Sequence, residues 1–220
     1  MRRVTALSLL SDREHYDELV LASMCRAKVS IWIATATLKD VRIEAPIGTA
    51  ARARGRYISL LERFVSLVRA GVEIRILHGA PPSRPFRASL AAAAELAAPG
   101  FELRHCPRVH LKLVVVDGAT LYLGSANLTG AGLGAKGEGR RNFEMGVVVD
   151  DDVLLDSTQS RFDRIWRGGE CGPCRLRSVC PAPLDQLGKS PTPDAIPKQG
   201  RRKPARPAPT RKRRRPPRKR

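Results

Sequence analysis

Short apolar runs rich in β-branched residues alternate with helical segments along most of this chain, and this alternation restricts the fold more than any other feature. Strands are predicted at 29–38, 72–79, 101–106 and 143–151 and in a strand–turn–strand unit at 110–127, and helices at 14–28, 56–71, 86–100 and 152–169. Strands that alternate with helices predict a layered α/β domain.

The C-terminal segment has a different composition. Ten of the 17 prolines lie between Pro181 and Pro217, and fourteen of the 40 Lys and Arg residues follow Leu187, against one acid, Asp194. The tail therefore supplies most of the formal net charge of +19, and about +6 remains for the body. We expect a domain over 1–184 and a disordered, Pro-rich basic tail over 185–220, because such a segment cannot build a core.

The charge distribution bears on partners and location. A basic tail attracts polyanions, either nucleic acid or an anionic membrane, although it could also serve only as a solvated tail. No apolar run is long enough to span a membrane, and the N-terminus lacks the pattern of a secretory signal. The sequence therefore predicts a cytoplasmic protein.

The segment 110–127, HLKLVVVDGATLYLGSAN, is mostly apolar but carries five polar side chains: His110, Lys112, Asp117, Ser125 and Asn127. Side chains two apart in a strand share a face, so His110 projects with Lys112, and Ser125 with Asn127. If the two strands pair, this set suits a phosphate diester. Lysine neutralises charge, the hydroxyl and the amide donate hydrogen bonds, and His110 is the candidate nucleophile.

The spacing His-x-Lys-x4-Asp-x6-Gly-Ser-x-Asn resembles the HKD motif of the phospholipase D superfamily at every fixed position, Gly124 included. The resemblance extends over most of 14–167 and implies a mixed sheet flanked by helices. It also implies that His110 attacks phosphorus to form a phosphohistidine. Asp117 resembles a structural member that fixes the turn at Asp117–Gly118.

Glu144 is the candidate acceptor for the second ring nitrogen of His110, because family members often carry an acid on the strand after the motif asparagine. The alternative is that Glu144 is an ordinary exposed strand residue.

The chemistry requires a second histidine as acid for the leaving group. The other histidines are His15, His78 and His105, and none is followed by x-Lys. Single-motif relatives resemble the small bacterial nucleases that pair across a homodimer, so the resemblance implies that two copies of His110 share one active site. It implies no metal for catalysis.

A Gly-rich loop over 129–141 follows the motif. It offers Lys136, Arg140 and Arg141 as candidate substrate-binding cations, or it is only a flexible connection.

Three cysteines, Cys171, Cys174 and Cys180, follow the last predicted helix with the spacing Cys-x2-Cys-x5-Cys. Close thiols in a reducing compartment favour metal ligation over disulfides. The spacing is similar to that of the cysteine triad of iron–sulfur nucleases, where a distant cysteine completes the cluster. An iron–sulfur cluster and structural zinc remain open, with Cys25 or Cys106 as fourth ligand; free redox-labile thiols are the alternative.

These features together predict a phosphodiesterase, and nucleic acid is the favoured substrate because of the basic charge. A phospholipase or cardiolipin hydrolase is the alternative enzyme. A non-catalytic nucleic-acid-binding protein is a third reading, which the complete histidine–lysine–asparagine set disfavours.

Overall fold

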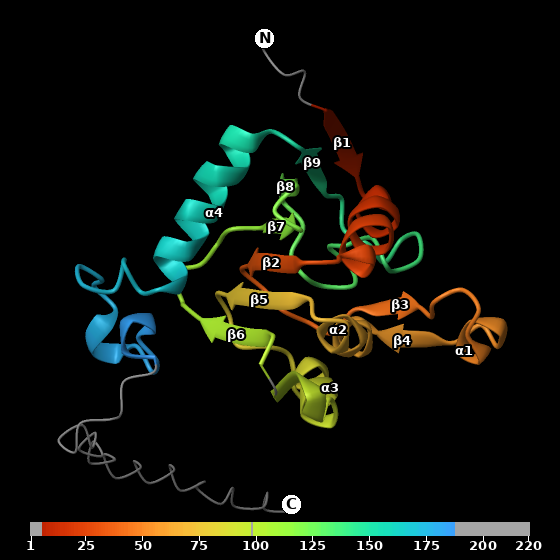
Figure 1. Ribbon diagram of the computed structural model, residues 1–220, viewed down its shortest axis with the longest axis horizontal. Coiled ribbons are helices and arrows are strands. Elements are labelled where there is room, and N and C mark those ends of the chain that lie inside the picture. The colour runs from red at the N-terminus through yellow and green to blue at the C-terminus, as the bar shows by residue number, and fades with distance from the viewer. Residues whose placement is uncertain (1–5, 98, 188–220) are drawn as a thin grey trace, which may run out of the picture. The chain divides into compact units, whose positions relative to one another are not determined.

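The computed structural model describes residues 6–97 and 99–187 (Figure 1). Their strands are β1 (Leu7–Ser11), β2 (Ser30–Thr35), β3 (Arg42–Glu44), β4 (Tyr57–Ser59), β5 (Glu73–His78), β6 (Phe101–His105), β7 (Leu113–Val116), β8 (Thr120–Gly124) and β9 (Met145–Val149). The helices are α1 (Ala50–Ala53), α2 (Leu60–Arg69), α3 (Arg84–Ala92) and α4 (Asp152–Trp166), with a π-type helix η1 (His15–Ser23) and four short 3-10 turns, η2 (Met24–Arg26), η3 (Ala94–Ala97), η4 (Arg177–Val179) and η5 (Leu184–Gln186).

Seven strands form one mixed sheet in the order β1-β9-β8-β7-β2-β5-β6. The strands β2, β5 and β6 run parallel, whereas β7 pairs antiparallel with both β2 and β8. The layered mixed sheet expected from the sequence is therefore confirmed. The small pair β3–β4 forms a second sheet.

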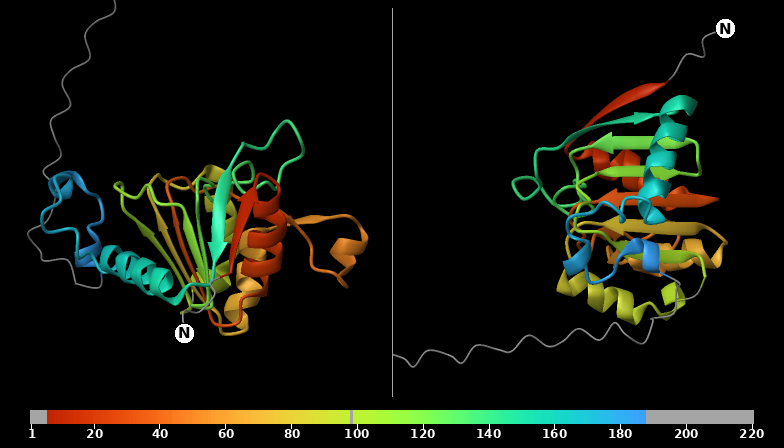
Figure 2. Two further views of the ribbon diagram at one scale, coloured as in Figure 1. Left: turned by 90° about the horizontal axis from the view of Figure 1, so that it is seen from above. Right: turned by 90° about the vertical axis from the view of Figure 1, so that its left-hand side faces the viewer.

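Helices cover both faces of the large sheet, with α4 on one face and η1 and α2 on the other (Figure 2). The alternation of β7 shows how one strand serves both layers: Val114 and Val116 pack with η1 and α2, and Leu113 and Val115 pack with α4. Burial on both faces explains why this strand is a continuous apolar run.

Two predicted helices have different bounds. The helix predicted at 56–71 begins only at Leu60, because Tyr57–Ser59 pairs as β4 and Ser59 then caps α2 in a capping box with Glu62. The helix predicted at 86–100 begins earlier, at Arg84, because Ser83 caps it and Pro85 fits its first turn. It ends at Ala92.

The strand–turn–strand unit is shorter than predicted. β7 starts at Leu113 and β8 ends at Gly124, so His110, Lys112, Ser125 and Asn127 lie in loops beyond the strand ends. The reason is the neighbouring strand: the last pair of the β2–β7 ladder joins Ala34 to Leu113. Strand alternation would direct Leu111 away from His110 and Lys112 into the core, but in the loop it is 36% exposed.

The last described element, η5, crosses the predicted boundary at residue 184, and its Leu184 is buried. The remainder of the predicted basic tail, 188–220, lies outside the described residues. No helix in the described part of the chain combines the length and apolar character needed to cross a bilayer.

Candidate active site

The polar motif residues gather at one end of the large sheet. The strand register places Thr35, His78 and His105 at the ends of β2, β5 and β6, beside the start of β7. The end of β8 and the start of β9 pair there as well, through Gly124 and Gly146. The loop that joins β8 to β9 thus leaves from the same end as the segment that carries His110.

A tight turn delivers His110 to this end. The backbone N–H of Val109 donates to the Cys106 carbonyl at 2.9 Å, and the Cys106 N–H donates to the His78 carbonyl at 2.9 Å. The turn crosses directly over Gly79, where a Cβ would overlap the Val109 carbonyl oxygen. A residue without a side chain at 79 therefore lets the histidine segment lie close to the end of β5.

His110 is exposed, and its partner is Lys112. Lys112 Nζ lies 3.1 Å from His110 Nε2 and 3.0 Å from the His110 carbonyl oxygen. An ammonium group can only donate, so this contact requires a lone pair on Nε2 and places the ring proton of a neutral His110 on Nδ1. The ring nitrogen with the free lone pair is thus the one beside the positive charge.

Asn127 is oriented by the end of β2. Its Oδ1 accepts a hydrogen bond from the Thr37 N–H at 3.0 Å, and the Thr35 hydroxyl lies 3.4 Å away. Thr35 Oγ1 also accepts from the Leu128 N–H at 3.0 Å. With its oxygen held in this way, Asn127 presents its amide NH₂ as a donor. Thr35 is a positioning residue that the sequence analysis missed, since contacts between distant segments leave no spacing signal.

Ser125 and Glu144 form a second polar group at this end. The Ser125 hydroxyl donates to Glu144 Oε2, Asn142 Nδ2 donates to Glu144 Oε1 at 2.9 Å, and the Asp12 carboxylate accepts from the Glu144 N–H at 2.9 Å. Glu144 is 8% exposed, so the alternative of an ordinary exposed strand residue does not hold. Among the described residues its side chain bonds Ser125 and Asn142, and no bond to His110 is present.

Packing against Tyr122 explains why position 124 of the motif is a glycine. The ring of Tyr122 lies across Gly124 and Gly146, and a Cβ at either position would overlap it. Burial raises the pKa of Tyr122 to about 12, so its hydroxyl stays neutral and lies 3.4 Å from the Ala126 N–H. This buried ring supports the backbone that carries Ser125.

Asp117 lies at the other end of β7, away from His110. Its carboxylate accepts hydrogen bonds from three consecutive backbone N–H groups, those of Lys28, Val29 and Ser30, at 2.8–3.0 Å. These contacts tie the β7–β8 turn to the start of β2. The structural role expected for Asp117 matches this geometry.

An open pocket of about 280 Å³ adjoins His110. Arg108 and Arg161 line it together with Leu111 and Glu170. Arg161 is neutralised by a 2.6 Å ion pair with Glu170, so Arg108 is the other cation that lines this pocket. Arg108 was missed in the sequence analysis, although it precedes His110 by the same spacing of two that separates His110 from Lys112.

The Gly-rich loop is tied down at several points. The Leu133 N–H donates to the Thr129 carbonyl at 2.9 Å, and the Asn142 N–H donates to the Ala131 carbonyl at 3.1 Å. Lys136 and Arg140 are exposed and Arg141 is half-buried. The loop starts and ends beside the motif, but no contact joins these three cations to His110 among the described residues.

The other three histidines are held by packing and by hydrogen bonds to the backbone. His15 is fully buried, with its ring edge-on to Tyr122, and burial lowers its pKa. His78 and His105 stack with centroids 5.2 Å apart, and each donates a hydrogen bond from one ring nitrogen to a backbone carbonyl. Burial lowers the pKa of His78 as well.

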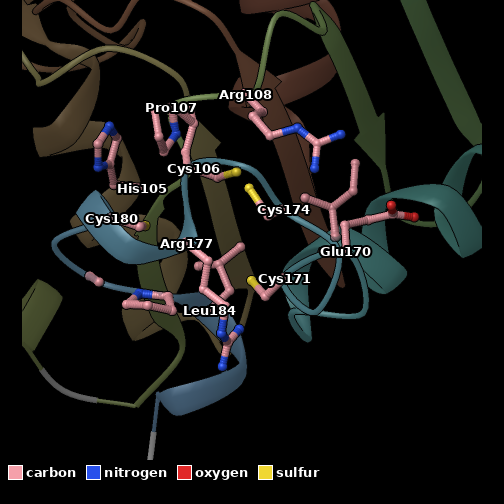
Figure 3. A pocket seen from close by; sticks show the side chains of 14 residues that line it. His105, Cys106, Pro107, Arg108, Glu170, Cys171, Cys174, Arg177, Cys180 and Leu184 are labelled. Atoms are coloured by element: carbon pink, nitrogen blue, oxygen red, sulfur yellow. The ribbon is translucent and has the colours of Figure 1, made fainter.

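Four cysteines surround a second pocket, beside the first. Cys106 lines it together with Cys171, Cys174 and Cys180 (Figure 3). Cys25 packs in the core on the opposite face of the sheet, where burial raises the pKa of its thiol to about 11. Within residues 6–97 and 99–187, no group of three or more His, Cys, Asp or Glu side chains is already close enough to hold a metal ion.

A mixed sheet with a histidine and a lysine at one end, backed by asparagine, serine and glutamate, defines a phosphodiesterase-type enzyme. Residues 20–166 match the family described as cardiolipin synthase, PLD-like domain, and the chain belongs to this family of the phospholipase D superfamily. The superfamily expected from the sequence is thereby confirmed.

Solved structures share the fold. Nuc from Salmonella typhimurium, a phospholipase D family member, is 23% identical with a TM-score of 0.51, and the match covers 74% of this chain and 95% of Nuc. NucT from Helicobacter pylori is 15% identical with a TM-score of 0.51, over 73% of this chain and 95% of NucT. The search of curated proteins finds no match.

Proposed function

We propose that this protein hydrolyses nucleic-acid phosphodiester bonds through a phosphohistidine at His110, without a catalytic metal. The observation that carries the proposal is the 3.1 Å contact of Lys112 Nζ with His110 Nε2. The His110 side chain is exposed and lines an open pocket. A cation at this position neutralises a phosphate that approaches the nucleophilic nitrogen.

In the first step, the lone pair of His110 Nε2 forms a bond to phosphorus, and the bond from phosphorus to the leaving oxygen breaks. That oxygen takes a proton from a second histidine. In the second step, water attacks phosphorus, the bond to Nε2 breaks, and the second histidine takes the proton from the water. Lys112 and the amide of Asn127 stabilise the negative charge that develops on the phosphoryl oxygens.

The second histidine comes, in this proposal, from His110 of the partner subunit in a homodimer. His15 and His78 are buried, and His105 is held by the Gly79 carbonyl and stacks on His78. Large apolar side chains are exposed around the site end of the sheet, where a partner would cover them: Leu111, Phe143 and Met145.

Charge supports a nucleic-acid substrate. The formal net charge is +19 over the full sequence, and most of it falls in the residues after Leu187. A polyanion with repeating phosphates can contact such a chain at many points beyond the reacting bond. The exposed Lys136 and Arg140 extend the candidate binding surface from the loop after β8.

The test is hydrolysis of single-stranded DNA, duplex DNA, RNA and labelled cardiolipin in EDTA by the wild type and by His110→Asn. We expect cleavage of nucleic acid by the wild type and a loss of at least about 10³-fold in the variant, because the nucleophile is gone. Acid-labile phosphate should be trapped on the wild type alone. Lys112→Ala should also lose activity, whereas Lys28→Ala, which removes an exposed lysine beside Asp117 at the other end of the sheet, should not.

Undiminished hydrolysis by a folded His110→Asn variant would refute the mechanism. Hydrolysis of cardiolipin with no cleavage of nucleic acid would instead select a phospholipid substrate. The description of the matching family as cardiolipin synthase is the observation that favours this second candidate.

A further inference from the structure

Two distant chain segments bring four thiols to one place. Cys106 follows β6, and the other three lie on the loop after α4. All four line a pocket with a free volume of about 30 Å³, in which the side chains of Cys106 and Cys174 point toward one another (Figure 3). None of the four is in a disulfide.

The backbone around these thiols resembles a thiolate-binding turn. The Cys174 N–H donates to the Cys171 carbonyl at 3.2 Å, which closes a turn over Gly172 and Pro173. The Leu176 N–H donates to the Cys174 sulfur, and the Arg108 N–H donates to the Cys106 sulfur. Both sulfurs thus accept from the backbone two residues later, and such donors stabilise a negative sulfur.

Positive side chains compensate the charge of this pocket. The Arg108 guanidinium also donates to the Cys174 sulfur, and Arg177 lines the same pocket. Four thiolates around a divalent ion leave a net charge of about −2. Arg108 offsets part of this charge, since Arg177 is already paired with Asp185 at 2.7 Å. Cys25 cannot complete the set, because it packs on the opposite face of the sheet.

We propose that Cys106, Cys171, Cys174 and Cys180 form a tetrathiolate site for a thiophilic metal, either one zinc ion or one iron–sulfur cluster. Each ligating thiol releases its proton on binding. Because the side chains do not already converge to coordination distance, the metal must draw the loop of 171–180 toward Cys106. That loop is built of turns, with η4 as its only helical element among the described residues, so it can adjust.

The test measures metal in the full-length protein purified anaerobically, and after addition of zinc or reconstitution with iron and sulfide. We expect the wild type and the matched control Cys25→Ala to hold about one zinc ion or one cluster per chain. Cys106→Ala and Cys174→Ala should lose at least about tenfold in metal affinity. Elemental analysis and visible absorption distinguish zinc from a cluster.

Alkylation followed by mass spectrometry provides a second measurement that does not depend on the variants. Metal should protect Cys106, Cys171, Cys174 and Cys180 from iodoacetamide and leave the modification of Cys25 unchanged. The proposal is overturned if the wild type binds neither metal after reconstitution, or if folded Cys106→Ala binds metal like the wild type. Neither readout uses hydrolysis, so the outcome is independent of the proposed function.

Discussion

The carboxylate of Asp117 stabilises the fold through its hydrogen bonds to the backbone, and it lies at the other end of β7 from His110. Partial burial acts to raise its pKa, but the N–H groups of Val29, Ser30 and Lys28 and the charge of Lys28 outweigh burial and hold the pKa below its usual value. The residue has a φ of 56°, in the left-handed region that asparagine also tolerates. Asp117→Asn therefore removes the charge with little backbone strain.

We expect Asp117→Asn to lower the free energy of unfolding by about 2 kcal/mol at pH 7, because three charge-assisted hydrogen bonds are weakened. A depressed pKa stabilises the fold above the unfolded-state value of about 3.9, and this contribution disappears as the pH falls through the folded-state pKa. The difference between wild type and variant should thus shrink below about pH 4.

Urea unfolding at pH 7 and at several acidic pH values measures this difference. Asp156→Asn, which removes an exposed carboxylate from α4, is the control and should change stability little. A difference between the wild type and Asp117→Asn that stays constant down to the lowest pH would contradict the assignment.

At the scale of elements, local pattern predicted the order of the main strands and helices because each buried segment carries its own periodicity. The polar residues of the motif could be predicted for a similar reason, because their spacing lies within one hairpin and is therefore visible in the local sequence. The strand ends were wrong at His110, Lys112, Ser125 and Asn127, because the length of β7 depends on where its neighbour β2 ends. No local signal contains that information.

Long-range contacts account for the other omissions. Thr35 reaches Asn127 across more than ninety residues, and Asp12 binds the backbone of Glu144. The edge strand β1 was missed because its five residues are mostly exposed and lack a clear alternation. The predicted contact between Glu144 and His110 came from the motif alone, and Glu144 instead bonds Ser125 and Asn142.

The close approach of Gly79, at the end of β5, to the segment that carries His110 can be tested by substitution. Gly79→Ala should push the Val109 carbonyl away and displace His110. We expect kcat/KM to fall by about 10- to 100-fold, because small displacements of a reacting group are costly. The measurement is turnover of a small chromogenic phosphodiester.

The matched control is Gly137→Ala, since a Cβ there would meet only the end of the Arg140 side chain, at an ordinary 3.7 Å, and the φ of Gly137 is not positive. Circular dichroism should show both variants folded. Wild-type turnover by folded Gly79→Ala would mean that the close approach does not position the histidine.

At the scale of the whole molecule, the proposed site needs two copies of the chain. Sedimentation should then give twice the chain mass of 24.1 kDa. When wild type and His110→Asn are mixed in equal amounts and allowed to exchange subunits, about a quarter of the dimers carry two intact histidines, so about a quarter of the activity should remain. Independent sites would leave about half, and a monomeric active enzyme would exclude a shared site.

The burial of Leu184 and the close packing of Gly168 on Asp185 affect how this protein can be divided. The family match ends at residue 166, but the following twenty or so residues complete the layer that α4 forms, and β1 and the start of η1 precede residue 20. The unit that folds is therefore longer than the unit recognised by homology. A gene fragment cut at the homology limits would remove buried Leu184 from the core around α4 and would also remove the edge strand β1. Insolubility of such a fragment would therefore say nothing about the intact chain.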